Sequence, residues 1–229
     1  MTKSRAPGSS PASEAREHSA SSTGSRVKRS QRRQARRNRA SPGESRARQG
    51  RAIGVLVSGE GTNLQALIDQ GLPVLAVASS RPGVRALERA RAAGIDTGAF
   101  PLVDHATREA RDAAMADWLE QHGVSLVVCA GFMELLTTSF LARFPDRIVN
   151  VHPSLLPQFP GTRPIDEAVA AGVDATGVTV HLVDEGVDTG PVLAQEEVAV
   201  EPRETLVQRI HAVEHRLLPR VVSELCNER

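Results

Sequence analysis

The chain has 229 residues and a formal net charge of only +1, but the charge is divided unevenly along it. Residues 1–49 carry 13 of the 28 basic side chains and 3 of the 27 acidic ones, a net charge of +10, which leaves −9 on residues 50–229. No apolar run approaches the ~20 residues that a membrane helix requires, so a helical membrane protein is excluded. Cys129 and Cys226 lie far apart, which indicates a reduced, cytoplasmic protein rather than a disulfide framework.

The first 49 residues consist mainly of Ser, Arg, Ala and Gln, with almost no large apolar side chains. Such a segment cannot bury enough surface to offset the entropy of ordering its backbone, so we expect a disordered basic tail. It lacks the apolar stretch of a secretory signal and the periodicity of a transit peptide. The basic run at residues 26–39 would suit nucleic acid or an anionic surface; the alternatives are a solvated tail or sequence ahead of the true start of translation.

Residues 50–229 alternate between apolar runs typical of strands and stretches typical of helices. The first half predicts strands at 52–57, 74–79 and 125–130, and helices from residue 63, at 85–93 and at 107–122. In the last of these helices we expect Ala110, Ala113, Ala114, Trp118 and Leu119 on one side.

The second half predicts a helix at 134–144, a strand at 147–151, alternating runs at 177–183 and 192–200, and a final helix at 205–225. Continuous apolar strands separated by helices favour an α/β fold, with three layers around a mostly parallel, twisted, Rossmann-like sheet. The two alternating runs add a possible antiparallel strand. In such sheets, ligands bind beyond the carboxyl ends of the strands, which indicates the segments after Val57, Ala130 and Val151.

The first of these segments, residues 58–63, is rich in glycine and precedes a helix. Glycines let the backbone turn tightly and present its N–H groups, and the helix N-terminus favours an anion, so a phosphate would fit here. The dinucleotide fingerprint is incomplete, because Leu64 stands where its third glycine should be. The alternative is an ordinary tight turn with an Asn cap.

A second segment, residues 150–157, ends a strand with Asn150 and His152 two positions apart, so both side chains face the same side. A carboxamide and an imidazole in one site can stabilise an oxyanion that develops on a carbonyl-like carbon. The alternative is a core histidine beside an asparagine that ends the strand.

A third segment, residues 184–191, is a glycine-containing turn with three acids, Asp184, Glu185 and Asp188. A carboxylate close to His152 would favour the cationic imidazole and could help move a proton from an attacking amine. Spacing alone does not choose among the three acids, and the alternative is a solvated hairpin turn.

Taken together, these strings resemble the phosphoribosylglycinamide (glycinamide ribonucleotide) formyltransferases, folate-dependent enzymes of purine biosynthesis. The resemblance covers about residues 51–222 and none of the tail. It is carried, in order, by residues 57–66, 130–133, 150–157, 159–161 and 184–191, with Glu214, His215 and Pro219.

The resemblance implies a formyltransferase domain at residues 50–229 that moves a formyl group from 10-formyltetrahydrofolate, its co-substrate, to the amine of glycinamide ribonucleotide. It implies no metal, no membrane, small-molecule substrates, and a monomer or homodimer. By motif position, the implied roles are catalysis for Asn150, His152 and Asp188; phosphate and acceptor binding for Gly61, Thr62, Asn63 and Glu214; and folate binding for Arg108, Met133, Leu135, Leu136, Asn150, Asp184 and Asp188.

Three residues depart from the family pattern. Glu134 stands where a basic residue is usual, Arg163 replaces a histidine, and Ser80 replaces an asparagine. They leave the central trio intact but bear on the substrate, and the Glu134 position lies at the expected entrance of the folate pocket.

Four alternatives remain open. Methionyl-tRNA formyltransferases share the Ser-Leu-Leu-Pro loop but carry a further C-terminal domain, and formyltetrahydrofolate hydrolases share the core. His211, Glu214 and His215 fit the H-x-x-E-H pattern of a zinc peptidase, although a chance match is the better explanation of so short a pattern. The chain could also be a nucleic-acid-binding protein that acts through the basic tail, in a salt-sensitive way.

Overall fold

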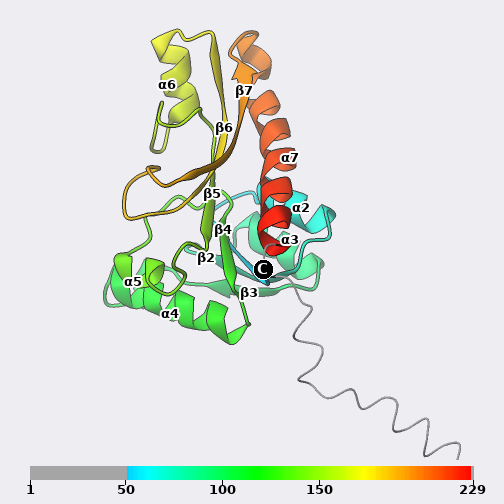
Figure 1. Ribbon diagram of the computed structural model, residues 1–229. Coiled ribbons are helices and arrows are strands. Elements are labelled where there is room, and N and C mark those ends of the chain that lie inside the picture. Colours follow the sequence, from blue (N-terminus) through cyan, green and yellow to red (C-terminus); the bar gives the residue numbers. More distant parts are fainter. Residues whose placement is uncertain (1–50, 228–229) are drawn as a thin grey trace, which may run out of the picture. The chain divides into compact units, whose positions relative to one another are not determined.

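The structure, a computed structural model, describes residues 51–227; the tail predicted for residues 1–49 lies outside them. Seven strands form one sheet in the order β3-β2-β1-β4-β5-β6-β7 (Figure 1). The strands are β1 (Ile53–Val57), β2 (Val74–Ser79), β3 (Asp96–Ala99), β4 (Leu126–Cys129), β5 (Ile148–His152), β6 (Ala175–Leu182) and β7 (Val192–Ala199). The helices are α2 (Thr62–Asp69), α3 (Arg85–Ala92), α4 (Arg108–Gln121), α5 (Thr138–Leu141), α6 (Pro164–Ala171) and α7 (Leu206–Asn227), with 3₁₀ turns η2 (Leu102–Asp104) and η3 (Arg203–Thr205).

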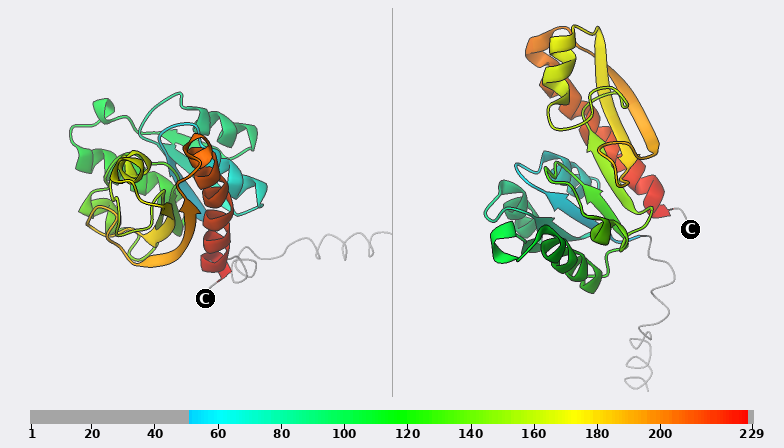
Figure 2. Two further views of the ribbon diagram at one scale, coloured as in Figure 1. Left: turned by 90° about the horizontal axis from the view of Figure 1, so that it is seen from above. Right: turned by 90° about the vertical axis from the view of Figure 1, so that its left-hand side faces the viewer.

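The sheet is parallel over its first five strands and turns antiparallel at β6. β1 pairs in parallel with β2 and β4, β2 with β3, and β4 with β5. β6 runs antiparallel to β5, and β7 antiparallel to β6. The predicted α/β class and the predicted antiparallel strand are therefore confirmed. In the views of Figure 2, β6 and β7 extend beyond the parallel strands together with α6.

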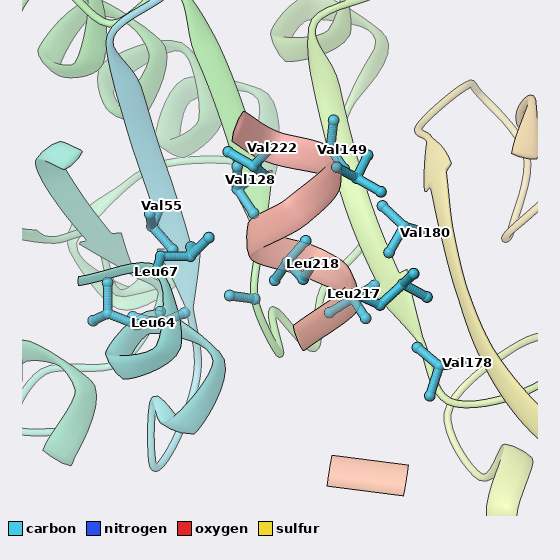
Figure 3. Packing of buried hydrophobic residues seen from close by; sticks show 14 of the residues in the cluster. Val55, Leu64, Leu67, Val128, Val149, Val178, Val180, Leu217, Leu218 and Val222 are labelled. Atoms are coloured by element: carbon cyan, nitrogen blue, oxygen red, sulfur yellow. The ribbon is translucent and has the colours of Figure 1, made fainter. Parts of the chain in front are cut away.

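Helices cover both faces of the sheet, which explains why the central parallel strands β1 and β4 are buried at every position. One buried cluster joins the sheet to α2, α3 and α7, and a second joins it to α4 and α5. Figure 3 shows Leu217, Leu218 and Val222 of α7 lying over Val128 of β4 and Val149 of β5. Burying one such side chain contributes about 1.5–3 kcal/mol to folding. The contacts of α7 therefore make it an important part of the core on this face of the sheet.

The predicted helix at 134–144 is wrong over most of its length. Residues 134–137 are irregular, and α5 spans only Thr138–Leu141. The cause lies in two buried side chains of α4: Arg111 binds the Glu134 carboxylate, and Asp112 accepts a hydrogen bond from the backbone N–H of Thr137 at 2.8 Å. These bonds fix the irregular segment against α4.

The predicted face of the helix at 107–122 is confirmed only in part. Leu119 is buried and Trp118 packs against the core, but Ala110 is exposed, and the buried residues of α4 also include Arg111, Asp112 and Met115. A hydrophobic pattern cannot predict this face, because two of its buried members are charged. β3 and α6 were missed, since a four-residue strand with a polar start and a helix that follows a proline-rich loop give weak periodic signals. Among the described residues, no helix has both the length and the apolar character needed to cross a membrane.

Candidate active site

A cavity of about 510 Å³ lies at the carboxyl ends of β4 and β5. It is lined by the segment after β4, the end of β5 with its following loop, and the turn after β6. Its volume falls in the ~300–1,000 Å³ range of small-molecule sites. Two of the three segments expected to face a ligand contribute to it; the loop after Val57 does not. The lining includes each residue assigned by resemblance to folate: Arg108, Met133, Leu135, Leu136, Asn150, Asp184 and Asp188.

The trio of Asn150, His152 and Asp188 comes together around the carboxylate of Asp188. Its Oδ2 accepts a hydrogen bond from the backbone N–H of Gly161 at 2.8 Å and lies 3.4 Å from Nδ1 of His152. Its Oδ1 lies 3.3 Å from Nδ2 of Asn150 and 3.5 Å from Nε2 of His181. Four donor positions from three separate segments therefore converge on one carboxyl group.

The structure distinguishes the three acids of the turn that spacing left equivalent. Asp184 and Glu185 are exposed, whereas 14% of the Asp188 side chain is exposed. Asp184 accepts hydrogen bonds from Gly186 N and from Thr189 Oγ1, so it supports the turn itself. Asp188 is the acid of this turn that contacts the imidazole and the carboxamide.

The pKa of Asp188 is lowered from its ordinary value. Burial by itself raises this pKa, but hydrogen bonds from His181 and the Gly161 amide and the charge of the two imidazoles outweigh burial. The carboxylate therefore stays anionic as the pH falls below the ordinary range of an aspartate. The stability that it contributes is present above its unfolded pKa and is lost as the pH falls through the lowered folded pKa.

His152 ends β5 with both ring nitrogens facing acceptors. Nε2 lies 2.8 Å from the carbonyl oxygen of Phe159, which can only accept, so Nε2 carries a hydrogen. Nδ1 faces the carboxylate of Asp188 at 3.4 Å. A hydrogen on Nδ1 would point at the Asp188 carboxylate and could be shared with a ligand in the cavity.

Three groups to which the sequence analysis assigned no role hold this cluster: His181, the Phe159 carbonyl and the Gly161 amide. In the antiparallel pairing of β5 and β6, Asn150 lies opposite His181. The sequence does show a histidine in an apolar alternating run just before the acidic turn. It does not show which strand lies next to that run, and so it could not place His181 against Asn150.

Backbone geometry around the cluster is unusual. Phe159 and Asp188 adopt φ values of 53° and 54°, in the left-handed region that costs an L residue roughly 1–2 kcal/mol. Such conformations persist where surrounding contacts fix them, and they gather at functional sites. Gly190 follows Asp188 closely, and a Cβ there would overlap the carbonyl oxygen of Leu182. The turn can therefore approach β6 only with glycine at this position.

The loop after β1 places Gly61, Thr62 and Asn63 at the N-terminus of α2, as predicted. Gly61 is the N-cap with φ 73°, and no side chain caps the helix, so the first-turn N–H groups lack a side-chain acceptor. A Cβ at Gly61 would lie 2.6 Å from Cβ of Ala86. The alternative of an Asn cap is wrong, because Nδ2 of Asn63 donates to Oε2 of Glu214 on α7 at 3.1 Å.

Asn63 and Glu214 form a second polar centre. Burial raises the pKa of Glu214, against the hydrogen bond from Asn63 and the charge of His211. Oδ1 of Asn63 is buried and has no hydrogen-bond partner among the described residues, so it can accept from a ligand. Neither residue lines the large cavity; Thr62 and His215 line a separate one of about 350 Å³. The structure thus brings the predicted acceptor-binding residues together, but not onto the wall of the large cavity.

The zinc alternative gains no support from the geometry. The rings of His211 and His215 stack with centroids 6.1 Å apart. Within residues 51–227, no three His, Cys, Asp or Glu side chains are grouped so that they could hold a metal ion.

Comparison with known proteins identifies the family. The sequence model described as formyl transferase matches residues 51–222, which include every residue of the cluster. The chain belongs to the formyl transferase family. A phosphoribosylglycinamide formyltransferase of Mycobacterium tuberculosis is 45% identical over 179 residues, which are 75% of this chain and 83% of that protein.

Further members of the formyl transferase family resemble the chain in sequence and in fold. A trifunctional purine biosynthetic protein of Drosophila melanogaster is 44% identical over 186 residues; these are 76% of this chain but only 14% of that much longer protein. The crystal structure of glycinamide ribonucleotide transformylase 1 from Symbiobacterium toebii matches with a TM-score of 0.73 and 44% identity, covering 76% of this chain and 86% of that one.

The structure accounts for the acidic residue at position 134 of this formyl transferase. Arg111 of α4 is fully buried; its Nε donates to Asp112 at 2.6 Å, and its Nη1 donates to Glu134. Burial by itself raises the pKa of Glu134, but the hydrogen bond and the charge of Arg111 lower it overall. Glu134, one of the three departures, therefore serves as a partner of a buried cation. Another, Arg163, is 72% exposed and pairs with Asp166.

Glu134→Gln is expected to destabilise the fold by about 1–3 kcal/mol, because it leaves the buried Arg111 cation with Asp112 as its remaining carboxylate. At roughly 2–4 °C per kcal/mol for a domain of this size, the melting temperature should fall measurably. Thermal unfolding tests this, with Glu120→Gln as the control, since Glu120 pairs with Arg143 on the surface and should contribute less than about 1 kcal/mol.

The difference in stability between the wild type and Glu134→Gln should change with pH in one direction. Because the folded pKa of Glu134 is lowered, the stabilisation is present above its unfolded pKa and is lost as the pH falls through the folded pKa. The gap in melting temperature between wild type and Glu134→Gln should therefore close in acid. A gap that is absent at neutral pH, or that widens in acid, would contradict the assignment.

Proposed function

We propose that this chain transfers the formyl group of 10-formyltetrahydrofolate to the primary amine of glycinamide ribonucleotide, a step of de novo purine biosynthesis. The family supports the reaction class, and the names of relatives covered over most of their length support the acceptor. The observation that carries the proposal is the position of His152, Asn150 and Asp188 together on the wall of a cavity with the volume of a small-molecule site.

The donor fits the cavity lining by its chemistry. Met133 and Leu135 are large apolar side chains that are 59% and 56% exposed, which is typical of a surface that a ligand covers. With Leu136 they offer an apolar wall to the flat ring system of a folate. Arg108, at the start of α4, offers a guanidinium to the carboxylates of its glutamate tail.

Attack begins at the formyl carbon. The amine lone pair forms the new C–N bond, and the C=O electrons move onto the oxygen as the tetrahedral intermediate forms. The N–H of His152 Nδ1 donates to this oxyanion, and the Asn150 carboxamide lies beside it. Donors that are already held in place, as the Phe159 carbonyl holds His152, stabilise the developing charge without reorganising.

Asp188 transfers a proton from the attacking amine to the leaving nitrogen. The attacking nitrogen becomes cationic, and the anionic carboxylate takes its extra proton, directly or through a water molecule. The bond between the formyl carbon and N10 of the folate then breaks, its electrons return to N10, and the proton passes from Asp188 to that nitrogen. The products are the formamide and tetrahydrofolate, and Asp188 is again anionic.

The acceptor uses the second polar centre. Its phosphate would bind the uncapped first turn of α2 at Gly61, Thr62 and Asn63, where N–H groups and the helix dipole favour an anion. Asn63 Oδ1 and the Glu214 carboxylate would accept hydrogen bonds from its hydroxyl or amine groups.

A direct assay tests the proposal: the protein is mixed with 10-formyltetrahydrofolate and glycinamide ribonucleotide, and formyl-folate loss is followed together with formylated product. One equivalent of product should appear for each formyl-folate consumed. Turnover with charged initiator tRNA instead would identify methionyl-tRNA as the acceptor. Release of formate without any acceptor would identify a formyltetrahydrofolate hydrolase.

Residues 50–229 are proposed to form the formyltransferase domain, and residues 1–49 to be dispensable for its activity. Deleting residues 1–49 should leave kcat and both KM values unchanged within assay error, because each group of the proposed mechanism lies in residues 61–214. Steady-state kinetics of the truncated and full-length chains check this. A large loss of turnover would assign the tail a catalytic role, and salt-sensitive nucleic-acid binding lost on deletion would support the binding alternative.

We also propose a cytoplasmic enzyme that acts as a monomer or homodimer. Cell fractionation and sedimentation of the purified chain would decide these two points.

A further inference from the structure

The wall of the large cavity carries mostly negative charge. Its lining contains one Lys or Arg side chain, Arg108, and five acids. One of these acids, Asp188, belongs to the proposed catalytic trio, and the other four are Glu109, Glu134, Asp184 and Glu185. Three of the four are exposed and Glu134 is partly exposed, so these carboxylates lie where the cavity opens to solvent.

Two of the acids at this opening interact with the charge of Arg108. Glu109 follows Arg108 at the start of α4. The pKa of Glu109 is lowered, first by hydrogen bonds from its own backbone and from Thr107, and then by the charge of Arg108. Burial raises the pKa of Glu134, but Arg111 and, to a smaller extent, Arg108 lower it overall. Both carboxylates are therefore anionic at neutral pH, within reach of the one guanidinium in the cavity lining.

Glu134 is held at the opening by its bond to α4. Its carboxylate pairs with the buried Arg111, which also pairs with the buried Asp112 at 2.6 Å. One cation and two carboxylates leave these three residues with a net charge of −1. Glu134 is the member of the group that lines the cavity, so the excess negative charge faces a ligand there.

The proposed donor brings negative charge of its own to the opening. Its reacting carbon must meet the catalytic trio, so its glutamate tail extends outward to Arg108, which can bind a carboxylate. Folates carry one glutamate or a chain of several, and each added glutamate brings one further carboxylate. Once Arg108 is engaged, an added carboxylate meets Glu109 and Glu134, and like charges at a solvent-exposed opening repel in a salt-dependent way.

We infer that this cavity selects a folate with one glutamate over a folate with several, and that Glu109 and Glu134 set this preference. The inference rests on the proposed function, because it concerns the tail of the proposed donor. It gives the two residues no part in the chemistry, since they act on the donor only through their charge. Their effect should therefore fall on the KM of the donor more than on kcat.

Kinetics with two forms of the donor test the preference. 10-Formyltetrahydrofolate with one glutamate and with three is compared at low ionic strength with the acceptor fixed. The kcat/KM for the triglutamate should be about 3- to 10-fold lower. Added salt should narrow this difference, because the Debye length falls from about 30 Å at 0.01 M to about 8 Å at 0.15 M. Equal values, or a higher value for the triglutamate, would overturn the inference.

Variants of the two acids test which residues set the preference. Glu109→Gln keeps the shape of an exposed side chain and should narrow the ratio of the two kcat/KM values about 2-fold, and Glu109→Lys should narrow it further. Glu134→Gln should act in the same direction at a temperature below its unfolding. Glu120→Gln is the matched control, because Glu120 lies on the same helix outside the cavity lining and should leave the ratio unchanged. A ratio that both changes at Glu109 leave unaltered would remove this residue from the inference and contradict it.

Binding measurements separate this inference from the proposed function. Calorimetry with the oxidised 10-formylfolate, carrying one or three glutamates, needs no acceptor. If the monoglutamate binds more tightly but glycinamide ribonucleotide is not formylated, the proposed acceptor is wrong and the tail preference stands. If the two bind equally, the preference is wrong whatever the acceptor. If neither binds, the proposed donor is wrong, and the proposed function and this inference are both refuted.

Discussion

Replacing His152 by alanine is expected to lower kcat about 10³- to 10⁴-fold, with little change in either KM. His152 supplies the N–H that meets the oxyanion, and it does so from a ring fixed between the Phe159 carbonyl and Asp188. The interaction strengthens only as charge develops on the formyl oxygen, so its loss falls on kcat and not on substrate binding. Steady-state assays that vary each substrate measure both parameters.

The fold should survive this substitution, because alanine keeps the backbone pairing of β5 with β6, and water in the cavity can donate to the Phe159 carbonyl. An unchanged melting temperature would show this, and His105→Ala, outside the cavity lining, serves as the control. Imidazole added to His152→Ala should restore part of the activity, since the alanine leaves room for it. A variant that retains near-normal kcat would remove His152 from the mechanism.

The sequence predicted the parallel sheet well because its strands are buried on both faces. Each residue of β1 and of β4 is buried, so a short apolar run was an unambiguous sign of a strand. The failures arose where charge is buried. Arg111 and Asp112 occupy the inner face of α4, where a hydrophobic pattern assigns alanines, and their bonds to Glu134 and Thr137 prevent the helix predicted after β4.

The sequence could predict those features of the candidate site that lie within one continuous segment of the chain. Asn150 and His152 share a face by the period of a strand, and the glycine loop after β1 precedes a helix N-terminus. The choice of Asp188 needed either the family resemblance or the structure, because it depends on how the turn folds over β5. His181 needed the β5–β6 register, which no local pattern in the sequence contains.

Replacing Asp188 by asparagine is expected to lower kcat about 10²- to 10⁴-fold. The backbone should be kept, because asparagine also tolerates the left-handed φ of 54° at this position. The carboxamide cannot take a proton from the attacking amine, and its N–H₂ end must face one of the donors that now converge on the carboxylate: the Gly161 amide, His152 or Asn150. The expected fall in kcat therefore has two causes: one unfavourable donor–donor contact and the loss of the anion beside His152.

The pH profile separates the charge from the shape of Asp188. In the wild type, activity should persist as the pH falls below the ordinary range of an aspartate, because the pKa of Asp188 is lowered, and it should decline as the carboxylate is protonated. Asp188→Asn carries no proton at this position to titrate, so that limb should be absent from its residual activity. Asp117→Asn, an exposed acid of α4 paired with Arg143, should keep the wild-type profile. Near-normal kcat in Asp188→Asn would mean that water alone accepts the proton, and the carboxylate would then act only by holding His152 and Asn150 in place.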